Sequence, residues 1–261
     1  MIKSARVSVV TVTRNDECGL IKTAQSLSTQ TYPNFQHVVV DGASTDGSVA
    51  WLEMYEPAYD LVWASEPDRG IFDAMNKGVS KADGELVVFM NSGDVFHDND
   101  VISLVAKKWE ESRFCWGYGA MRYMNAHGDH VGETNQYPHR QRLLELGHAF
   151  APHQATFVER AFFLSLGGFD EDFSFAADQE FAMRAGRLSP PLVWREYSAD
   201  FLLGGVHSQS TYWIRERLYH KMRGKNRAYV LGSRIVDRLY TETMALYRET
   251  RQWFGRRLAH R

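Results

Sequence analysis

The first ninety residues alternate between short apolar runs and segments in which apolar residues recur every three or four positions. Val7–Val12 is a run of apolar, mostly β-branched residues, which predicts a buried strand. Residues 17–29 then carry Leu20, Ala24 and Leu27 at the spacing of one helix face. The pattern continues with strands predicted at 35–40, 61–64 and 86–90 and helices at 48–55 and 71–80. This alternation predicts an α/β fold with a mostly parallel central sheet covered by helices.

Polar side chains cluster directly after four of the predicted strands. The clusters are Thr13-Arg14-Asn15, Asp41-Gly42-Ala43-Ser44, Glu66-Pro67-Asp68 and Asn91-Ser92-Gly93-Asp94. One such cluster is explained as a turn, because Asp, Asn, Ser and Gly are the usual turn residues. Four at the carboxyl ends of parallel strands indicate a binding site, since α/β sheets bind their ligands at that edge. Asp41 can accept a hydrogen bond from a base or a ribose, and Asp94 suits a divalent cation that holds a diphosphate.

Beyond about residue 112 the periodicity is weaker. Short β-like segments at 114–124 and 155–158 alternate with turns, a helical segment follows Asp178, and the chain after Ser210 has mostly helical spacing. No Gly-x-Gly-x-x-Gly fingerprint follows the first strand, and no Gly-Lys-[Ser/Thr] motif occurs. Dinucleotide-dependent oxidoreductases and P-loop NTPases therefore lack their main sequence support. With 261 residues and 44% hydrophobic composition, the chain suffices for one large domain or for one domain with an appendage.

The net charge of −2 is unevenly distributed. Residues 215–261 contain 13 Lys and Arg against 4 Asp and Glu, which makes the body acidic and the C-terminal tail basic. On a helix that advances about 100° per residue, the apolar positions of this tail share one sector and most arginines lie opposite. The apolar set is Leu231, Ile235, Leu239, Leu246 and Trp253, and the basic set is Arg234, Arg238, Arg248, Arg251 and Arg256. Such a helix suits an anionic membrane surface. The alternative is packing on the rest of the chain or on a second copy in a homodimer.

Other classes of protein are disfavoured by what the chain lacks. The longest unbroken apolar run in the middle of the chain, Leu86–Met90, is far shorter than the roughly 20 residues of a transmembrane helix. The N-terminus enters a predicted strand without the cleavage region of a signal peptide. Cys18 and Cys115 are too few for a disulfide framework or a zinc site. We therefore expect a cytoplasmic protein without a nucleic-acid partner, peripheral on the inner face of the cell membrane if its tail binds lipid.

Several stretches of the chain resemble a known family. VSVVTVTRN, SLSTQTYPNFQHVVVDGASTDGS and SEPDRGIFDAMNKGVSKADGELVVFMNSGD follow one another and together resemble the N-terminal half of the family 2 glycosyltransferases. APHQATFVERAFFLSLGGFDEDFSFAADQEFAMR is similar to the acceptor-side half of the branch that builds bacterial exopolysaccharides, capsules and cell-surface glycolipids. The resemblance covers about residues 6–210. It implies an inverting enzyme of the GT-A fold that uses a nucleotide-sugar donor.

The resemblance also implies roles for individual residues. Those that would bind the nucleotide-sugar, with Asp41 at the base, are Thr13, Arg14, Asn15, Asp41, Asp68, Asn76 and Asn91. Asp178, in FAADQEF, matches the residue proposed as the catalytic base in the family. His153 and Gln154 match a segment near the acceptor sugar.

The chain departs from the family pattern at the metal motif. Many members carry two or three acidic residues where this chain has Asn91-Ser92-Gly93-Asp94, and only Asp94 is acidic here. One carboxylate with diphosphate oxygens and water can still hold Mg²⁺ or Mn²⁺, because Mg²⁺ keeps several waters. His207 could add a nitrogen ligand, which Mn²⁺ tolerates better than Mg²⁺. The alternative for His207 is an ordinary loop histidine.

The sequence therefore predicts a GT-A domain over residues 1–210 and a basic, amphipathic helical extension over residues 211–261. The predicted activity is metal-dependent transfer of a sugar from a nucleotide-sugar to a glycan or lipid-linked sugar, in surface polysaccharide or glycolipid synthesis. Two alternatives stay open. A sugar-phosphate nucleotidyltransferase of the same fold would usually carry a glycine-rich basic loop after the first strand, and TVTRNDECG has one arginine and one late glycine. A non-catalytic nucleotide-sugar-binding module draws its support from Asn91 and Gly93.

Overall fold

The computed structural model describes residues 4–125, 127–134, 137–203 and 212–259, with residues 252–259 described by their backbone alone. The chain divides into two compact units. A sheet unit comprises Met1–His139 and Ala151–Leu203, and a helical unit comprises Arg140–Phe150 and Gly204–Arg261. The helical unit thus includes a segment from the middle of the chain, which the sequence pattern does not predict. Among the residues described, no helix is both long enough and apolar enough to cross a bilayer.

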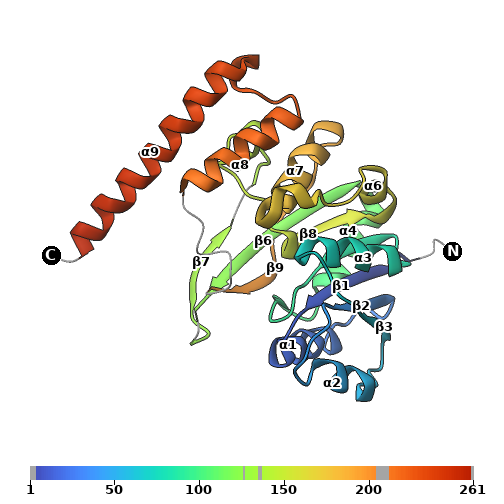
Figure 1. Ribbon diagram of the computed structural model, residues 1–261. Coiled ribbons are helices and arrows are strands. Elements are labelled where there is room, and N and C mark those ends of the chain that lie inside the picture. The colour runs from blue at the N-terminus through green and yellow to red at the C-terminus, as the bar shows by residue number, and fades with distance from the viewer. Residues whose placement is uncertain (1–3, 126, 135–136, 204–211, 260–261) are drawn as a thin grey trace. The chain divides into compact units, whose positions relative to one another are not determined.

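The sheet unit is built on one sheet of nine strands, counted over the described part of the chain (Figure 1). The strand order is β3-β2-β1-β4-β8-β6-β9-β5, and β7 pairs with β6. The first four strands in this order are parallel. Their bounds are β1 (Val7–Thr13), β2 (Phe35–Asp41), β3 (Asp60–Ser65) and β4 (Leu86–Phe89). The carboxyl ends of these four strands therefore lie at one edge of the sheet.

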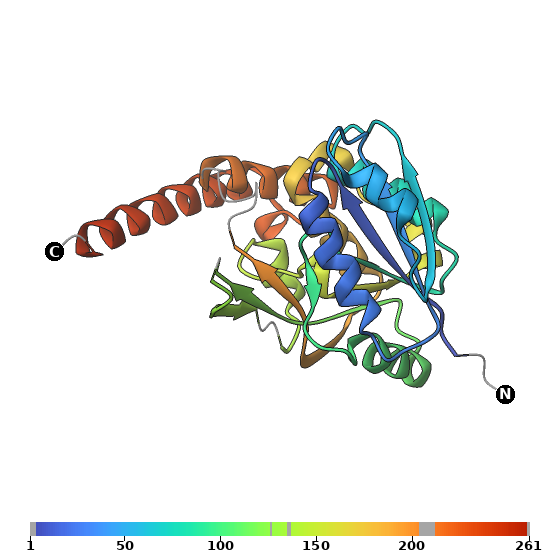
Figure 2. The same cartoon turned by 90° about the horizontal axis from the view of Figure 1, so that it is seen from below.

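Two helices cover one face of these parallel strands. α1 (Glu17–Ser28) and α2 (Ser48–Met54) contribute Leu20 and Leu52 to a buried cluster that includes Val39 of β2. Figure 2 shows α1, in dark blue, in front of the strands on this face. The spacing of the apolar positions of α1 is what directs Leu20 toward the sheet.

The opposite face of the same strands is covered by α3 (Ile71–Lys81). This helix approaches closely at Gly78, where a Cβ atom would collide with Val10 and contact Val40. Because successive residues of a strand point to opposite faces, Val39 packs toward α1 and α2, whereas Val40 packs toward α3. Burial on both faces explains why valine dominates β1 and β2.

The second half of the sheet begins where β8 (Thr156–Glu159) pairs antiparallel with β4. The start of β8 therefore lies beside the end of β4, and the short helix η1 (His153–Ala155), which precedes β8, adjoins the loop that follows β4. The other elements are β5 (Val95–Phe96), α4 (Val101–Ser112), β6 (Trp116–Met124), β7 (His130–Thr134), α6 (Arg160–Ser165), η2 (Glu171–Ala176), α7 (Ala177–Leu188) and β9 (Leu192–Leu202).

The predicted fold class is confirmed. The four strands and three helices expected within the first ninety residues match the observed bounds to within one residue at each end. The predicted helical C-terminal region is also present. The sequence pattern did not predict α4, β5, β7 or β9.

The described residues of the helical unit form two long helices and two short ones. α8 (Tyr212–Lys225) packs along α9 (Arg234–Ala259), and the turn between them contains η4 (Val230–Gly232). The inserted segment supplies α5 (Gln141–Glu145). The C-terminal region is therefore two helices rather than one continuous helix.

The core of the helical unit holds a buried ion pair. Arg223 and Asp237 are both fully buried, and Arg223 Nε donates to Asp237 Oδ1 at 2.6 Å. Arg223 also donates to Thr241 Oγ1 at 2.8 Å and to the backbone oxygen of Glu145 at 3.3 Å. Asp237 accepts a further hydrogen bond from the backbone N–H of Val230 at 2.9 Å. Removing one partner would leave the other charge buried without compensation, which is far costlier than losing an exposed pair.

We expect Asp237→Asn to lower the free energy of unfolding of the helical unit by about 3–5 kcal/mol, because Arg223 then loses its counter-ion. Burial opposes ionisation of Asp237, but hydrogen bonds from Arg223, Val230 and His220 outweigh it and lower its pKa. The stabilisation is thus complete above the unfolded pKa of about 4 and is lost as the pH falls through the lower folded value. Chemical denaturation at about pH 7 and about pH 3 should show wild type and variant converging in acid.

The matched control is Glu242→Gln. Glu242 pairs with Arg238 at 3.2 Å on the exposed side of α9, so its loss should change the unfolding free energy by less than about 1 kcal/mol. If both variants lost the same unfolding free energy, the buried Asp237–Arg223 pair would stabilise the unit no more than the exposed pair does.

Candidate functional site

Backbone hydrogen bonds bring the polar clusters together at the carboxyl edge of the parallel strands. The N–H of Gly42 donates to the carbonyl oxygen of Thr13 at 2.9 Å, which joins the ends of β2 and β1. The N–H of Ser92 donates to the carbonyl oxygen of Val12 at 3.1 Å, which joins the segment after β4 to β1. The cluster Glu66-Pro67-Asp68 follows β3, which pairs with β2 in the sheet. The candidate site therefore begins as a set of adjacent loops.

The loop after β1 is tied to the loop after β2. Asn15 adopts a positive φ of 52°, its N–H donates to Ser44 Oγ at 2.8 Å, and its Oδ1 accepts from the N–H of Thr45 at 2.7 Å. Arg14 is exposed at this edge. Thr13 Oγ1 is buried and has no hydrogen-bond partner among the residues described. Asn15 thus shapes the loops, whereas Arg14 is available to a ligand.

Asp41 is fully buried at the end of β2. Its Oδ1 accepts from Ser44 Oγ at 2.5 Å, and its Oδ2 accepts from the N–H of Ser44 at 2.9 Å and from Ser65 Oγ at 2.6 Å. A carboxylate has about four acceptor positions. Three are used here to fold the loop after β2, which leaves one on Oδ1.

Asp68 and Arg14 converge on Gly42. A Cβ atom at Gly42 would collide with the Asp68 carboxylate and contact the Arg14 side chain. The segment before Asp68 is held by Lys77, whose Nζ donates to the backbone oxygen of Pro67 at 2.8 Å. The glycine thus allows an acidic and a basic side chain from different loops to approach the same backbone.

Asn76 is committed to the backbone of Phe169. Its Nδ2 donates to the carbonyl oxygen of Phe169 at 2.9 Å, and its Oδ1 accepts from the N–H of Phe169 at 2.9 Å. Gly168, with a φ of 72°, leaves room for the amide because a Cβ there would collide with it. Asn76 therefore joins α3 to the segment before η2 with both ends of its amide.

The loop after β4 is held by Thr23 of α1. The Thr23 hydroxyl donates to the carbonyl oxygen of Asp94 at 2.8 Å and contacts that of Asn91 at 3.1 Å. It also accepts from the N–H of Gly93 at 3.0 Å. Nothing in the sequence singles out Thr23, because it lies within an ordinary amphipathic helix.

Asp94 is buried beside two residues from η1. Its Oδ2 accepts from the N–H of Asn91 at 3.2 Å, and its carboxylate also accepts a hydrogen bond from the Gln154 side chain. Burial raises the pKa of Asp94 to about 6, against the lowering effects of His153 and Gln154. The structure therefore brings Gln154 and His153, expected on the acceptor side, against the metal motif.

A chain of hydrogen bonds links this motif to Asp178. Asn91 Nδ2 lies 3.0 Å from His153 Nε2, and His153 Nδ1 lies 3.2 Å from Asp178 Oδ2. Because an amide nitrogen can only donate, His153 Nε2 is the acceptor and the single proton of the neutral ring is on Nδ1. That proton is donated to Asp178, whose Oδ1 accepts from the N–H of Gln179 at 2.8 Å. Asp178 is thus held as a buried carboxylate at the start of α7.

The residues present suit a divalent cation that takes most of its ligands from the substrate and from water. No group of three or more His, Cys, Asp or Glu that could hold a metal occurs in the described part of the chain. Asp94 offers one carboxylate, and Asn91 Oδ1 is buried without a hydrogen-bond partner among the described residues. Two oxygen ligands fit a cation whose other ligands are diphosphate oxygens and water. His207, the other predicted ligand, lies outside the described residues.

Comparison with protein families and known sequences gives one consistent answer. A model of the family described as Glycosyl transferase family 2 matches residues 8–165. An uncharacterized glycosyltransferase of Mycobacterium tuberculosis is 34% identical over 252 residues, which cover 95% of this chain and 94% of that protein. A glycosyltransferase of Mycobacterium bovis, named for PGL/p-HBAD biosynthesis, is 28% identical over 193 residues, or 72% of each chain.

Solved structures of low sequence identity share the fold. TarS 1–349 of S. aureus in complex with UDP-GlcNAc has a TM-score of 0.70 at 19% identity, covering 90% of this chain and 70% of that one. The mannosyltransferase PcManGT from Pyrobaculum calidifontis, in complex with GDP-Man and Mn²⁺, has a TM-score of 0.66 at 19% identity. That match covers 94% of this chain and 72% of that chain. The GT-A architecture inferred from the sequence is therefore confirmed.

Asn76→Ala tests whether this amide lines the donor pocket or holds the backbone. We expect the free energy of unfolding to fall by about 1–3 kcal/mol per group left unsatisfied, because both the N–H and the C=O of Phe169 lose their partner. Donor affinity, measured by calorimetry, should change less than about threefold, since both polar atoms of Asn76 are engaged by the backbone of Phe169. Asn34→Ala is the control: its exposed amide bonds Ser4, and its loss should cost under about 0.5 kcal/mol. A large loss of donor affinity with normal stability would restore Asn76 to the donor pocket.

Proposed function

This chain belongs to glycosyltransferase family 2, and we propose that it transfers a sugar from a nucleoside-diphosphate sugar to an acceptor hydroxyl with inversion at the anomeric carbon. The observation that carries the proposal is the hydrogen-bonded chain from Asn91 through His153 to Asp178. It joins the loop suited to a diphosphate to the carboxylate suited to a general base. The UDP-GlcNAc bound to TarS and the GDP-Man bound to PcManGT support this class of donor.

In this proposal the donor lies along the carboxyl ends of β1, β2 and β4. The exposed Arg14 guanidinium offers a positive charge to the diphosphate. Thr13 Oγ1 and the open position on Asp41 Oδ1 offer hydrogen-bonding capacity to the nucleoside. Asp68, packed against Gly42, is an acidic group beside these loops that could accept from a sugar hydroxyl.

Asp178 is the proposed general base. Its carboxylate takes the proton of the acceptor hydroxyl while the hydroxyl oxygen forms a bond to the anomeric carbon. The bond from that carbon to the diphosphate oxygen breaks, and its electron pair leaves with the nucleoside diphosphate. Attack from the side opposite the leaving group inverts the configuration at that carbon.

His153 is the proposed positioning residue for this base. By donating Nδ1–H to Asp178, it holds the carboxylate in one orientation. Asn91 fixes the tautomer by occupying Nε2. The proton of the acceptor hydroxyl goes to Asp178, and His153 itself does not change its protonation state.

Asp94 and Asn91 Oδ1 are the proposed ligands of a divalent cation, with His207 as a further candidate. When bound, the cation would neutralise charge on the departing diphosphate. The Mn²⁺ in PcManGT supports the use of a divalent ion. The raised pKa of Asp94 reflects its burial, and a bound cation would favour the ionised form.

The proposed acceptor is a glycan or a lipid-linked sugar in the synthesis of a surface polysaccharide or glycolipid. The relative named for PGL/p-HBAD biosynthesis supports a glycolipid. The proposed location is the inner face of the cell membrane, with the helical unit as the peripheral anchor. Its exposed apolar residues support this location, and they include Leu231, Ile235 and Leu239.

A panel of UDP-, GDP- and dTDP-sugars tests the proposed activity. The wild-type protein should release the nucleoside diphosphate from one donor class, and EDTA should abolish the release. Asp94→Ala should lower it about 10²–10³-fold, the usual cost of losing a preorganised group that stabilises charge. Binding without turnover would instead identify a nucleotide-sugar-binding module. Production of a nucleotide-sugar from a sugar phosphate would identify a nucleotidyltransferase.

Asp178→Asn should lower kcat about 10²–10⁴-fold, because the amide cannot accept the proton. The KM for the donor should stay within about twofold if the residue acts only in the chemical step. His153→Ala should lower kcat about 10²-fold through misplacement of the base. The control His130→Ala changes an exposed histidine on β7 and should leave kcat unchanged.

The double variant separates positioning from a general structural effect. If His153 acts through Asp178, His153→Ala combined with Asp178→Asn should be no slower than Asp178→Asn alone. Multiplicative losses would show that the two residues act independently and would remove the positioning role.

A further inference from the structure

Several apolar side chains of α9 are exposed between residues 234 and 251. Ile235, Leu239 and Leu246 lie on one side of the helix and are 75%, 59% and 55% exposed. The residues that α9 buries belong to a different side, which includes Asp237 and Ala245. The sequence left open whether the apolar side would pack within the protein, and within the helical unit it does not. An exposed apolar stripe of this kind indicates an interaction surface.

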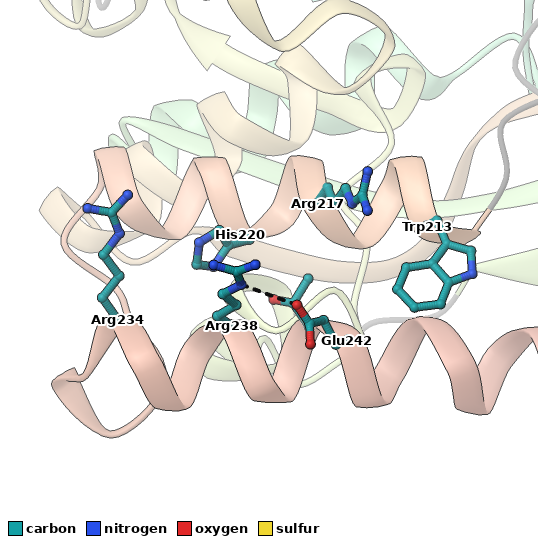
Figure 3. A pocket seen from close by; sticks show the side chains of 7 residues that line it. Trp213, Arg217, His220, Arg234, Arg238 and Glu242 are labelled. Carbon is teal, nitrogen blue, oxygen red and sulfur yellow. Dashed lines mark hydrogen bonds and ion pairs between the residues drawn. The ribbon is translucent and has the colours of Figure 1, made fainter.

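A groove between α8 and α9 adjoins this stripe. Its volume is about 300 Å³, and it is lined by Trp213, Arg217, His220, Arg234, Arg238, Thr241 and Glu242. Figure 3 shows the Arg217 and Arg238 side chains from the two helices at the centre of the groove, with Arg234 at one end and Trp213 at the other. Arg234 and Arg238 each precede a residue of the apolar stripe in the sequence. The groove and the stripe are therefore neighbouring surfaces of the same helix.

The groove contains more positive charge than its own carboxylate neutralises. Glu242 pairs with Arg238 at 3.2 Å, and His220 is hydrogen-bonded to the buried Asp237. Arg217 lies over the Trp213 ring at 5.9 Å, and neither Arg217 nor Arg234 forms an ion pair with any described residue. Two guanidinium groups are thus left for an external anion. Arg248, which the helical pattern places with the basic residues, is instead nearly buried and paired with Glu216 at 2.9 Å.

We propose that the α8–α9 groove binds the phosphate group of an anionic membrane lipid while the apolar stripe of α9 enters the lipid layer beside it. Arg217 and Arg234 are the phosphate ligands, since a guanidinium presents several donors to phosphate oxygens. Ile235 and Leu239 provide the apolar contact. The inference rests on the proposed membrane location and names the chemical group that the protein recognises there.

The combination of surfaces favours a membrane lipid over a free phosphate or a second copy of the chain. A soluble phosphate would use the guanidinium groups and leave Ile235, Leu239 and Leu246 in water. A second copy would present the same excess of basic residues, 13 Lys and Arg against 4 Asp and Glu over residues 215–261. An anionic lipid surface complements both the charge and the apolar side chains.

Sedimentation of the full-length protein with vesicles tests the proposal. Vesicles of phosphatidylcholine with phosphatidylglycerol should bind wild type at low salt, and vesicles of phosphatidylcholine alone should bind it weakly. Arg217→Gln/Arg234→Gln should reduce partitioning about 25-fold, since each basic residue near an anionic surface contributes about fivefold. Added salt should weaken wild-type binding. Ile235→Ser/Leu239→Ser should also reduce binding.

The charge-matched control is Arg215→Gln/Arg227→Gln, which removes two exposed arginines of the helical unit outside the groove. This control variant should lose less than about threefold in vesicle partitioning. A loss as large as that of the groove variant would show that the attraction is diffuse, and it would overturn the proposed phosphate site. If inorganic phosphate binds through Arg217 and Arg234 while vesicles are ignored, the ligand is a soluble phosphate. If vesicles are ignored and Ile235→Ser/Leu239→Ser splits a dimer, the stripe is a subunit interface. Either result overturns the lipid assignment.

Donor turnover in the absence of vesicles keeps this test separate from that of the enzyme. The groove variant should hydrolyse donor at the wild-type rate. If the wild-type protein turns over donor normally but does not bind vesicles, the groove assignment is rejected and the proposed transferase reaction is not. Vesicle binding without turnover supports the groove and rejects the proposed transferase reaction.

Discussion

Two hydrogen bonds on one imidazole determine the chemistry available at the candidate site. His153 receives a hydrogen bond from Asn91 on Nε2, so the neutral ring must keep its proton on Nδ1, and that proton meets Asp178. The arrangement depends on the antiparallel pairing of β8 with β4, which places η1 beside the end of β4. A change of register between these strands would separate the groups, because neighbouring residues of a strand point to opposite faces. The ladder between β4 and β8 is therefore as important to the site as the polar residues.

The parallel half of the fold could be predicted from the sequence because its information is local. β1 and β2 are buried along their whole length and are rich in valine, while α1 and α3 carry one apolar side each. β9 gave no such signal, since its burial is neither continuous nor alternating: Arg195 and Glu196 are both exposed, and Ser198 and Ala199 are both buried. The helical spacing of α4 is present in the sequence, with Val101, Val105 and Trp109 on its buried side. The insertion of residues 140–150 into the helical unit depends on tertiary contacts and has no local signal.

The candidate site was predictable in position more than in detail. Strand order alone places polar clusters at one edge of a parallel sheet, and the structure has them there. How each polar group is used depends on distant partners: Asp41 is occupied by Ser44 and Ser65, and Asn76 by Phe169. Motif position identified Asn91, His153 and Asp178 separately, but only the folded sheet shows that they form one hydrogen-bonded chain. Buried atoms without a described partner, such as Thr13 Oγ1, are also visible only in the structure.

The helical unit is closed by residues 140–150, which the whole second part of the sheet unit, Ala151–Leu203, separates in sequence from residues 204–261. Arg142 donates to the backbone oxygen of Ala228 at 2.9 Å, Arg223 to that of Glu145 at 3.3 Å, and Arg248 to that of Gly147 at 2.8 Å. A recombination event that exchanged only the C-terminal part of the gene would separate these donors from their acceptors. The unit therefore cannot be inherited as a simple terminal cassette, and its two segments must diverge together even though the sequence between them encodes part of the sheet.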